Sequence, residues 1–508
     1  MRFRTGITLL VCVACSRRDD PVPAIDGPLV LHVQFPSPGS LVPAQDSTAI
    51  WGTVGTGLAS LTVNGDTVQV APNGTFAAFL PVPAGTPALH LVAWRGSDAA
   101  TGTIPLHRAS DAPVNVATAD GRQRNWNHWV TLRRLPSDTA DSATQHRPIY
   151  SRWRPAGEVA IPLPIGTRML ADARTDRSIR LRLAGETRIW IPIEDADTAA
   201  VPRVGEVAAR LPAISFDSGG ISITVPLSER LPSTVEIQGD QLYWTIYGVR
   251  SDVASPVRIV NRDAIRTIAV RDTAPDRVVI QVSLAAIPLG WRTEWRAGAL
   301  TLRIRKPLAP TAALHELVVA VDAGHPPDGT VGPSRLSEDS VTLAAALSTA
   351  RKLRALGVTV ILTRSAAAPV SLEARALVAE QSAAHLFISL HLNAPGPGRP
   401  PETVDGTQVF YFNRNGQSLA QALLLEVAAA LKQKPIYFTQ REYAVLRPAW
   451  TAAVLVEGSS IVLPEREAFF RTQVGIDAYA QGIVNGILRW HGQAVSQNGT
   501  ATPAVKRD

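Results

Sequence analysis

The sequence predicts a multidomain protein in which all-β modules precede an α/β domain with a mostly parallel sheet. Its 508 residues are more than one hydrophobic core usually supports, since a domain has about 150 residues. Residues 25–308 contain short runs in which apolar and polar side chains alternate between turn residues, as half-buried strands require. After residue 315, continuously apolar runs alternate with helical patterns, which is typical of buried parallel strands joined by helices.

The composition is that of a folded protein and argues against a nucleic-acid partner. Hydrophobic residues make up 45% of the chain, charged residues make up 18%, and the formal net charge is +7. The basic residues are mostly scattered arginines, without the basic and aromatic clusters that nucleic-acid binding uses. The only cysteines are Cys12 and Cys15, so the rest of the chain has no thiol for a disulfide, a Cys-type zinc site or a catalytic cysteine.

The first 15 residues are predicted to be an export signal. A basic start is followed by an apolar run at 7–14, far shorter than the ~20 residues that a membrane-spanning helix needs. The run ends in small residues before Cys15, which resembles a bacterial lipoprotein processing site with Cys15 acylated after cleavage. Cys12 departs from that motif, which usually has Leu there, and a plain secretion signal or a misplaced start is the alternative. We therefore expect a lipid-anchored protein of the periplasm or cell envelope.

Residues 25–110 are predicted to form a β-sandwich. Their apolar runs have the length of short strands and lie at 29–33, 61–63 and 89–93. Asn-Gly pairs beginning at Asn64 and Asn73 mark tight turns. The pattern resembles immunoglobulin-like modules of bacterial surface enzymes, which usually act as spacers or wall contacts.

Two further β-regions are expected before the α/β domain. Residues 111–200 are predicted to hold a polar linker, marked only by Trp126 and Trp129, and then a small barrel that resembles bacterial SH3-like wall modules. Residues 203–308 show clean alternation at 221–225 and are predicted to form another β-domain. For all three β-regions the default interpretation is a packed module without chemistry of its own.

The α/β domain is expected over residues 315–491. Its strands are predicted at 317–321, 358–362, 386–390, 407–411 and 453–456. Its helices are predicted at 338–356, 371–384, 417–432 and 472–490, with Ser337 as a cap of the first. The tail at 492–508 lacks periodicity and is expected to be disordered.

Chemistry-bearing side chains follow three of the predicted strands. His325, His391 and Glu457 come at or after strand ends, where ligands sit in open α/β sheets. Glu338 begins the first helix, which should bring it near the same edge. Two histidines and one carboxylate are a common catalytic zinc shell with a position open for water, whose pKa the ion lowers. We assign His325, Glu338 and His391 as ligands of one zinc ion and Glu457 as general base.

Each of these residues also has a structural interpretation. A single histidine at a strand end is often only hydrogen-bonded, Glu338 could serve the helix dipole, and Glu457 could form a salt bridge. The shared sheet edge favours the site over these alternatives. The other three histidines of the α/β domain match no such position: His315, His385 and His491. The sequence leaves open whether four neighbours support the site or the fold: Asp322, Asn393, Arg364 and Arg375.

The order of these motifs resembles the zinc-dependent N-acetylmuramoyl-L-alanine amidases. The segments that carry the resemblance are "VVAVDAGH", "LSEDSVTLAAAL", "LFISLHLNA", "GTQVFYF" and "AVLVEGS". The resemblance implies a zinc hydrolase of the cell wall that cleaves the amide between N-acetylmuramic acid and L-alanine in peptidoglycan. It also places His325, Glu338 and His391 on the family's ligand positions and Glu457 on its catalytic glutamate.

The chain departs from the family pattern near the expected site. Pro326 and Pro327 replace the usual Gly-Gly after the first histidine, and Gly458-Ser459 replaces a Gly-Phe pair. Both changes bear on substrate preference. The segment between Phe412 and Gln417 is too short for the helical insert that covers the site in some periplasmic members. Two other functions remain open, a zinc peptidase that cuts within the stem peptide and a non-catalytic wall-binding protein.

Overall fold

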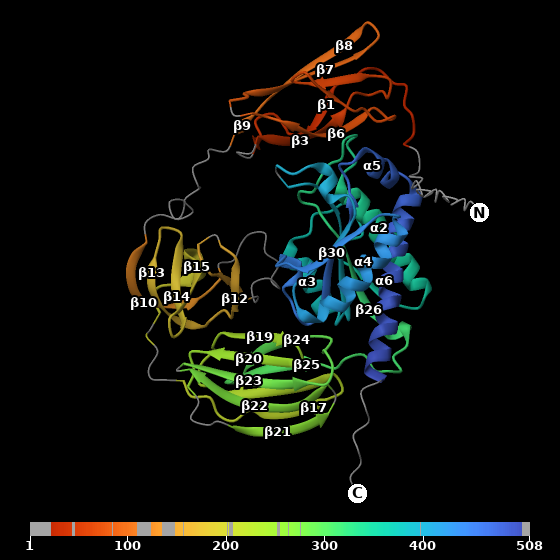
Figure 1. Ribbon diagram of the computed structural model, residues 1–508. Helices are drawn as coiled ribbons and strands as arrows, with labels where there is room; N and C mark the ends of the chain where they lie inside the picture. Colours follow the sequence, from red (N-terminus) through yellow and green to blue (C-terminus); the bar gives the residue numbers. More distant parts are fainter. Residues whose placement is uncertain are drawn as a thin grey trace, which may run out of the picture.

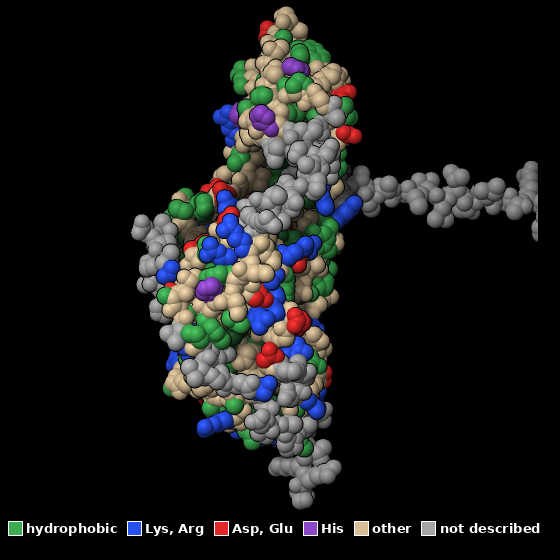
Figure 2. Space-filling model, turned by 90° about the vertical axis from the view of Figure 1, so that its left-hand side faces the viewer, with side chains coloured by type: hydrophobic (Ala, Val, Ile, Leu, Met, Phe, Trp, Pro, Cys, Tyr) green, Lys and Arg blue, Asp and Glu red, His purple; other side chains and the backbone are tan. Residues whose placement is uncertain are grey.

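The computed structural model describes residues 22–499 except 43–45, 84, 109–122, 135–147, 156, 201, 203–206, 251–254, 263, 275 and 397. The predicted export signal and Cys15 lie outside the described residues. Three groups of strands surround one α/β domain, and the first group lies against the end of that domain where α5 is drawn (Figure 1). In Figure 2, basic and acidic side chains are interspersed on the face shown, as expected from the scatter of arginines along the sequence.

The first β-module comprises strands β1 to β9. One sheet contains β1 (His32–Phe35), β3 (Ser47–Thr53) and β6 (Thr75–Pro81). The other contains β5 (Asp66–Val68), β4 (Ser60–Val63), β7 (Ala88–Arg95) and β8 (Asp98–Pro105), and a short parallel pair joins β2 (Leu41–Val42) to β9 (His107–Arg108). Residues of both sheets share one core, and the predicted turn at Asn64 and Gly65 joins β4 to β5 with positive φ at both residues.

The second β-module is a single seven-stranded sheet. Its strands are β12 (Val159–Leu163), β11 (Ile149–Arg152), β15 (Thr187–Pro192), β14 (Ser178–Ala184), β13 (Arg168–Arg174), β10 (Arg124–Leu132) and β16 (Ala196–Asp197), in that order. The prediction that Trp126 and Trp129 lie in a linker was wrong. They belong to β10, which pairs with β13 and β16. The backbone N–H and C=O groups of β10 thus bond to strands distant in sequence, although its side chains show little alternation.

The third β-module consists of two sheets that share a core around Trp244. One contains β17 (Ala213–Asp217), β18 (Gly220–Pro226), β25 (Ala299–Arg305) and β24 (Trp291–Arg296). The other contains β19 (Ser233–Gln238), β20 (Gln241–Tyr247), β23 (Arg277–Leu284), β22 (Ile265–Ala274) and β21 (Ser255–Arg262). The N-terminal region is thus rich in β-structure, as the alternation predicted.

The α/β domain contains a six-stranded mixed sheet. Its strands are β27 (Thr359–Leu362), β26 (Val318–Ala323), β28 (Leu386–Asn393), β31 (Ala452–Ser460), β29 (Thr407–Tyr411) and β30 (Pro435–Gln440), in that order. All neighbouring strands are parallel except β29 and β31, which are antiparallel. The sequence did not predict β30, an edge strand with no fully buried residue.

Both faces of this sheet are covered. The helices are α2 (Glu338–Ala355), α3 (Leu372–Gln381), α4 (Gln417–Ala430), α5 (Pro464–Phe470) and α6 (Gln473–Gly499). Val319 and Val321 pack in the core that includes α2, α4 and α6, whereas Ala320 packs in the core that includes α3. This placement explains why β26 is apolar at consecutive positions.

The end of the α/β domain differs from the prediction. Helix α6 continues to Gly499, so the expected disorder from residue 492 was wrong for 492–499. A helix can continue beyond its amphipathic part because its backbone hydrogen bonds are internal.

None of the helices in the described part of the chain combines the length and apolar character needed to cross a membrane.

The first and third β-modules pack directly on the α/β domain. Trp51 of β3 belongs to the α/β core cluster. Arg305 of β25 donates hydrogen bonds to the carbonyl oxygens of Ala384 at 2.8 Å and Trp450 at 2.9 Å. Burial lowers the pKa of Arg305 to about 10, with a further contribution from the charge of Arg292.

Candidate metal centre

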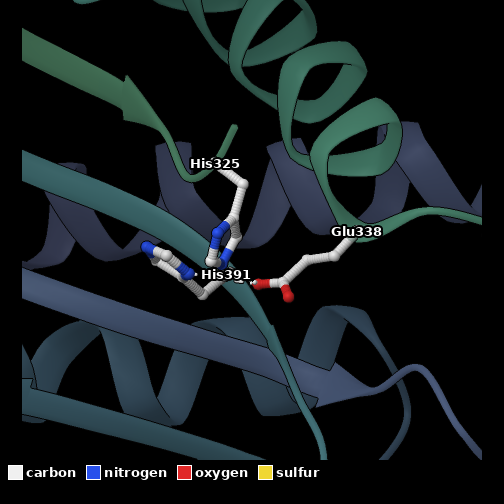
Figure 3. A group of neighbouring side chains, drawn as sticks. All are labelled: His325, Glu338 and His391. Atoms are coloured by element: carbon white, nitrogen blue, oxygen red, sulfur yellow. Dashed lines mark hydrogen bonds and ion pairs between the residues drawn. The ribbon is translucent and has the colours of Figure 1, made fainter. Parts of the chain in front are cut away.

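Three side chains from separate segments converge at one edge of the sheet (Figure 3). His325 follows β26, Glu338 is the first residue of α2, and His391 lies in β28. Their donor atoms all lie within 4.8 Å of one another. Glu338 Oε1 lies 3.2 Å from His325 Nε2 and 3.1 Å from His391 Nδ1, so both imidazoles face one carboxylate oxygen. This geometry agrees with the predicted meeting of the three residues, and their role as ligands stays a prediction.

The backbone after β26 is shaped to place His325 beside His391. A Cβ atom on Gly324 would lie 2.5 Å from the His391 ring, so only glycine allows this approach. His325 itself has a φ of 58°, in the left-handed region that non-glycine residues seldom adopt. The ring is therefore held in a backbone conformation that the surrounding contacts must stabilise.

Glu338 is held by more than the two histidines. Its Oε2 accepts a hydrogen bond from the backbone N–H of Thr330 at 2.9 Å, and its Oε1 accepts one from Leu392 at 3.0 Å. Ser337 is the N-cap residue as predicted, but its side chain makes no capping hydrogen bond. The buried Glu338 carboxylate is thus aimed at the histidines by two backbone amides, and a helix-dipole role alone would not require these contacts.

A buried ion pair supports the segment that carries His325. Arg375 Nη1 lies 2.7 Å from Asp322 Oδ1, and both side chains are almost fully buried. Arg375 Nη2 also donates to the carbonyl oxygens of His325 at 3.0 Å and Pro326 at 2.9 Å. Arg364 donates to the Gly324 carbonyl at 3.0 Å. The structure therefore gives these residues positioning roles, which the sequence left open.

The other residues in question have separate places. His385 Nδ1 accepts a hydrogen bond from the Val318 N–H at 2.9 Å, and burial, together with Arg305, lowers the pKa of His385 to about 4. A neutral histidine in this role is structural. Asn393 ends β28 and accepts a hydrogen bond from Ile461 N–H through its backbone carbonyl. His315 and His491 lie outside the ligand cluster found among the described residues, as expected.

The electrostatics of the cluster fit a divalent metal. Burial by itself raises the pKa of Glu338, but hydrogen bonds from His325 and His391 outweigh it and hold that pKa far below its usual range. Burial lowers the pKa of both histidines, but the hydrogen bond to Glu338 and the nearby negative charges together outweigh it, so both pKa values are raised. An anionic carboxylate between two imidazoles is a donor set that suits zinc and leaves a fourth position for water.

Glu457 lies beside this cluster without belonging to it. It occurs on β31 as the register partner of His391 on β28. Its Oε2 is buried and has no hydrogen-bond partner among the described residues. Burial raises the pKa of Glu457 to about 7; the charge of His391 opposes this shift and that of Glu338 adds to it. A carboxyl group with this pKa can both take up and release a proton near neutral pH.

Tyr479 is a supporting residue that sequence reasoning missed. It is fully buried in α6, and its hydroxyl donates to the carbonyl oxygens of His391 at 3.1 Å and Val456 at 2.9 Å. A Cβ atom on Gly458 would lie 2.6 Å from the Tyr479 ring, so this glycine makes the contact possible. The only sequence signal was a tyrosine on the apolar face of the last helix, which ordinary core packing explains equally well.

The fold places the candidate metal-binding residues beyond the carboxyl ends of the sheet strands, where open α/β sheets bind their ligands. Residues 319–489 match the family described as N-acetylmuramoyl-L-alanine amidase. This part of the chain is a domain of that amidase family, as the order of sequence motifs predicted.

Individual relatives agree with this family. The chain is 27% identical over 207 residues to the probable cell wall amidase LytH of Staphylococcus saprophyticus, covering 39% of this chain and 66% of that protein. It is 27% identical over 175 residues to the N-acetylmuramoyl-L-alanine amidase LytC of Bacillus subtilis, covering 34% and 35%. The chain thus spans less than two thirds of the length of these curated amidases. Among solved structures, the catalytic domain of CwlV from Bacillus (Paenibacillus) polymyxa has 28% identity and a TM-score of 0.33, covering 34% of this chain and 98% of that domain.

Proposed function

We propose that the domain at 315–491 is a zinc-dependent hydrolase that cleaves the amide between the lactyl group of N-acetylmuramic acid and L-alanine in peptidoglycan. His325, Glu338 and His391 would hold one zinc ion, and Glu457 would be the catalytic base. The observation that carries the proposal is the convergence of the three donor atoms within 4.8 Å, with Glu457 on the adjoining strand.

Zinc, when bound, would polarise the scissile carbonyl and lower the pKa of the attacking water. The Glu457 carboxylate takes the proton from that water as it attacks the carbonyl carbon. The same carboxyl group then gives the proton to the departing nitrogen, so that the L-alanine amine leaves in a neutral form. Its pKa of about 7 suits both transfers, because the group exchanges its proton readily near neutral pH.

The supporting residues hold the candidate ligands in fixed positions. Asp322 and Arg375 hold the backbone of His325, and Thr330 N–H holds the Glu338 carboxylate. Rigid ligands reduce the reorganisation needed as the amide reacts. Pro326 and Pro327 have no backbone N–H, whereas a Gly-Gly pair would offer two such donors. We therefore infer that this part of the site binds its substrate differently from members of the family that have Gly-Gly.

The decisive experiment combines metal analysis with digestion of purified peptidoglycan by the full chain. We expect about one zinc ion per chain and free peptides whose removal leaves lactyl ends on the sugar. New amines between amino acids would favour a peptidase that cuts within the stem. Stoichiometric zinc with no turnover on any wall preparation would favour a non-catalytic wall-binding protein. His325→Ala, which removes one ligand, is the matched control and should lose both zinc and activity.

The β-modules would hold the domain at its substrate. We infer that the first is an immunoglobulin-like module and the second an SH3-like module, supported by the paired sheets of the first and the small single sheet of the second. Sedimentation with insoluble peptidoglycan tests this role. A His325→Ala variant should still sediment, because the ligand mutation leaves the β-modules intact.

Export and lipid attachment complete the proposal. We propose that residues 1–15 direct export and that Cys15 carries a lipid which holds the protein at the membrane of the periplasm or cell envelope. A Cys15→Ser variant should leave the detergent-soluble membrane fraction and appear in the aqueous fraction. A Cys12→Ser variant is the matched control and should stay with the membrane; release by Cys12→Ser alone would contradict the assignment.

A further inference from the structure

Strand β3 of the first β-module is buried on both of its faces. Ile50 packs in the module's own core, whereas its neighbours Ala49 and Trp51 belong to the core cluster of the α/β domain. Phe35 and Phe79 of the same sheet pack against that cluster too. Because successive strand residues point to opposite faces, β3 serves two cores at once, as a permanent contact would require. A tethered spacer would not need this second apolar face.

Trp51 makes a directed contact within this interface. Its indole Nε1–H donates a hydrogen bond to the carbonyl oxygen of Val331 at 3.1 Å. Its ring stacks on Phe35 with centroids 4.3 Å apart and an interplanar angle of 14°. The side chain is 5% exposed, so the orientation of the indole is fixed by packing on both sides.

Val331 lies in the loop of residues 326–337, which joins His325 to Glu338. The preceding residue, Thr330, donates its N–H to Glu338 Oε2 at 2.9 Å and accepts the Glu338 N–H at its carbonyl, also at 2.9 Å. Glu338 Oε1 in turn faces both histidines. The hydrogen bond from Trp51 and those to Glu338 are therefore linked through the covalent backbone of the neighbouring residues Thr330 and Val331.

The same loop is also anchored by Glu467 of α5. This carboxylate is fully buried and accepts hydrogen bonds from the backbone N–H groups of Ser334 at 2.9 Å and Leu336 at 3.1 Å. A Cβ atom on Gly332 would lie 2.6 Å from Glu467 Oε1, so the loop closes tightly on this group. Helix α5 also lies against β6 of the first module (Figure 1). The loop thus has hydrogen-bonded partners both in α5 and in the first β-module.

We propose that the first β-module is an integral part of the catalytic unit and that Trp51 is a positioning residue, which fixes the Glu338 carboxylate toward His325 and His391 through the loop 326–337. This inference rests on the proposed function for the catalytic role of the site. The coupling of Trp51 to Glu338 through the loop 326–337 does not depend on that function. The first β-module would then influence the metal affinity and the turnover of the site, although none of the module's side chains lies in it.

The test compares two substitutions in the full chain. Trp51→Phe keeps an aromatic ring in the interface and removes the indole N–H; Trp51→Ala removes both. Trp94→Phe is the matched control, because Trp94 lies on β7 of the same module and is 38% exposed. The readouts are hydrogen exchange of the peptide spanning 326–340 in metal-free protein, zinc affinity by competition with a chromophoric chelator, and turnover on peptidoglycan.

We expect Trp51→Phe to accelerate exchange of the 326–340 peptide about fivefold and to weaken zinc binding about three- to tenfold, since one supporting hydrogen bond is lost. The turnover number should fall with little change in KM, because substrate contacts stay in place. Trp51→Ala should have larger effects and Trp94→Phe none. Effects confined to Trp51→Ala would assign the positioning to packing of the ring.

The proposal is overturned if both Trp51 variants keep the exchange of 326–340 and the zinc affinity within twofold of the unchanged protein. That conclusion holds whether or not Trp51→Ala unfolds the first module, since a module that is dispensable for the site cannot position it. Failure of the proposed function looks different: the unchanged protein would release no peptide from peptidoglycan, while the exchange measurement would still test the coupling.

Discussion

His391 and Glu457 are register partners on the neighbouring parallel strands β28 and β31. Register partners on adjacent strands point to the same face of a sheet, so this pairing places the two side chains at the same level of the same edge. The arrangement puts a carboxyl group beside the candidate ligand set, where it can act on a water molecule there without being a ligand itself. It also makes the position of Glu457 depend on strand pairing rather than on a loop.

Replacement of Glu457 by Gln should abolish turnover and preserve zinc binding. The amide keeps the size of the side chain but cannot accept the proton of the attacking water, and loss of a general base reduces rates about 10²- to 10⁴-fold. Peptide release from purified peptidoglycan and zinc content are the measurements. Glu402→Gln, at an exposed position in the short turn Pro401–Val404, is the control and should retain full activity. Near-normal turnover of Glu457→Gln would remove the base assignment.

Zinc affinity should fall as the pH is lowered, from a pH above the ordinary histidine value of about 6.5. The pKa values of His325 and His391 are raised because the hydrogen bond to Glu338 and the nearby negative charges together outweigh burial, so each imidazole is protonated at a higher pH than usual. A protonated imidazole cannot bind zinc, and the affinity should drop about tenfold per pH unit for each proton displaced. Chelator competition between pH 8 and 6 checks this, and a constant affinity over that range would contradict it.

Replacement of Arg375 by Met should lower the free energy of unfolding of the α/β domain by about 3–5 kcal/mol. The substitution leaves Asp322 as a buried carboxylate without its ion-pair partner, and the carbonyl oxygen of His325 loses a donor. The calorimetric transition of the domain should shift downward. Arg351→Met is the control, because its ion pair with Asp477 lies at the surface and should contribute less than about 1 kcal/mol. Equal effects of the two variants would show that the Arg375 network does not support the fold.

Replacement of Arg305 by Met should loosen the third β-module from the α/β domain. The change leaves the carbonyl oxygens of Ala383, Ala384 and Trp450 without the guanidinium donor, at a cost of about 1–3 kcal/mol for each group left unpaired. Small-angle X-ray scattering should report a larger radius of gyration, and backbone exchange should accelerate on both sides of this contact. Arg303→Met on the same strand breaks only the more exposed ion pair with Asp217 and should leave the scattering unchanged. A compact Arg305→Met protein would show that other contacts suffice for docking.

Much of the fold follows from local patterns. The continuous apolar run of β26 predicted a strand buried on both faces, and Val319 and Ala320 do pack in different cores. The Asn64-Gly65 turn was predicted because only such residues adopt its positive φ angles easily. Strands β10 and β30 escaped prediction, since their pairing with distant strands compensates for weak alternation.

The sequence by itself determined which residues are the candidates for the chemistry, because His325, Glu338, His391 and Glu457 stand at strand and helix ends that a parallel sheet must bring to one edge. Only the tertiary structure decided how these residues are held. Tyr479 contacts the backbone of His391, and Glu467 and Trp51 contact the loop 326–337, all from distant segments; Trp51 and Val331 are 280 positions apart. Local sequence patterns do not reveal such contacts, since a buried side chain that packs on a distant segment looks in the sequence like one that packs within its own module.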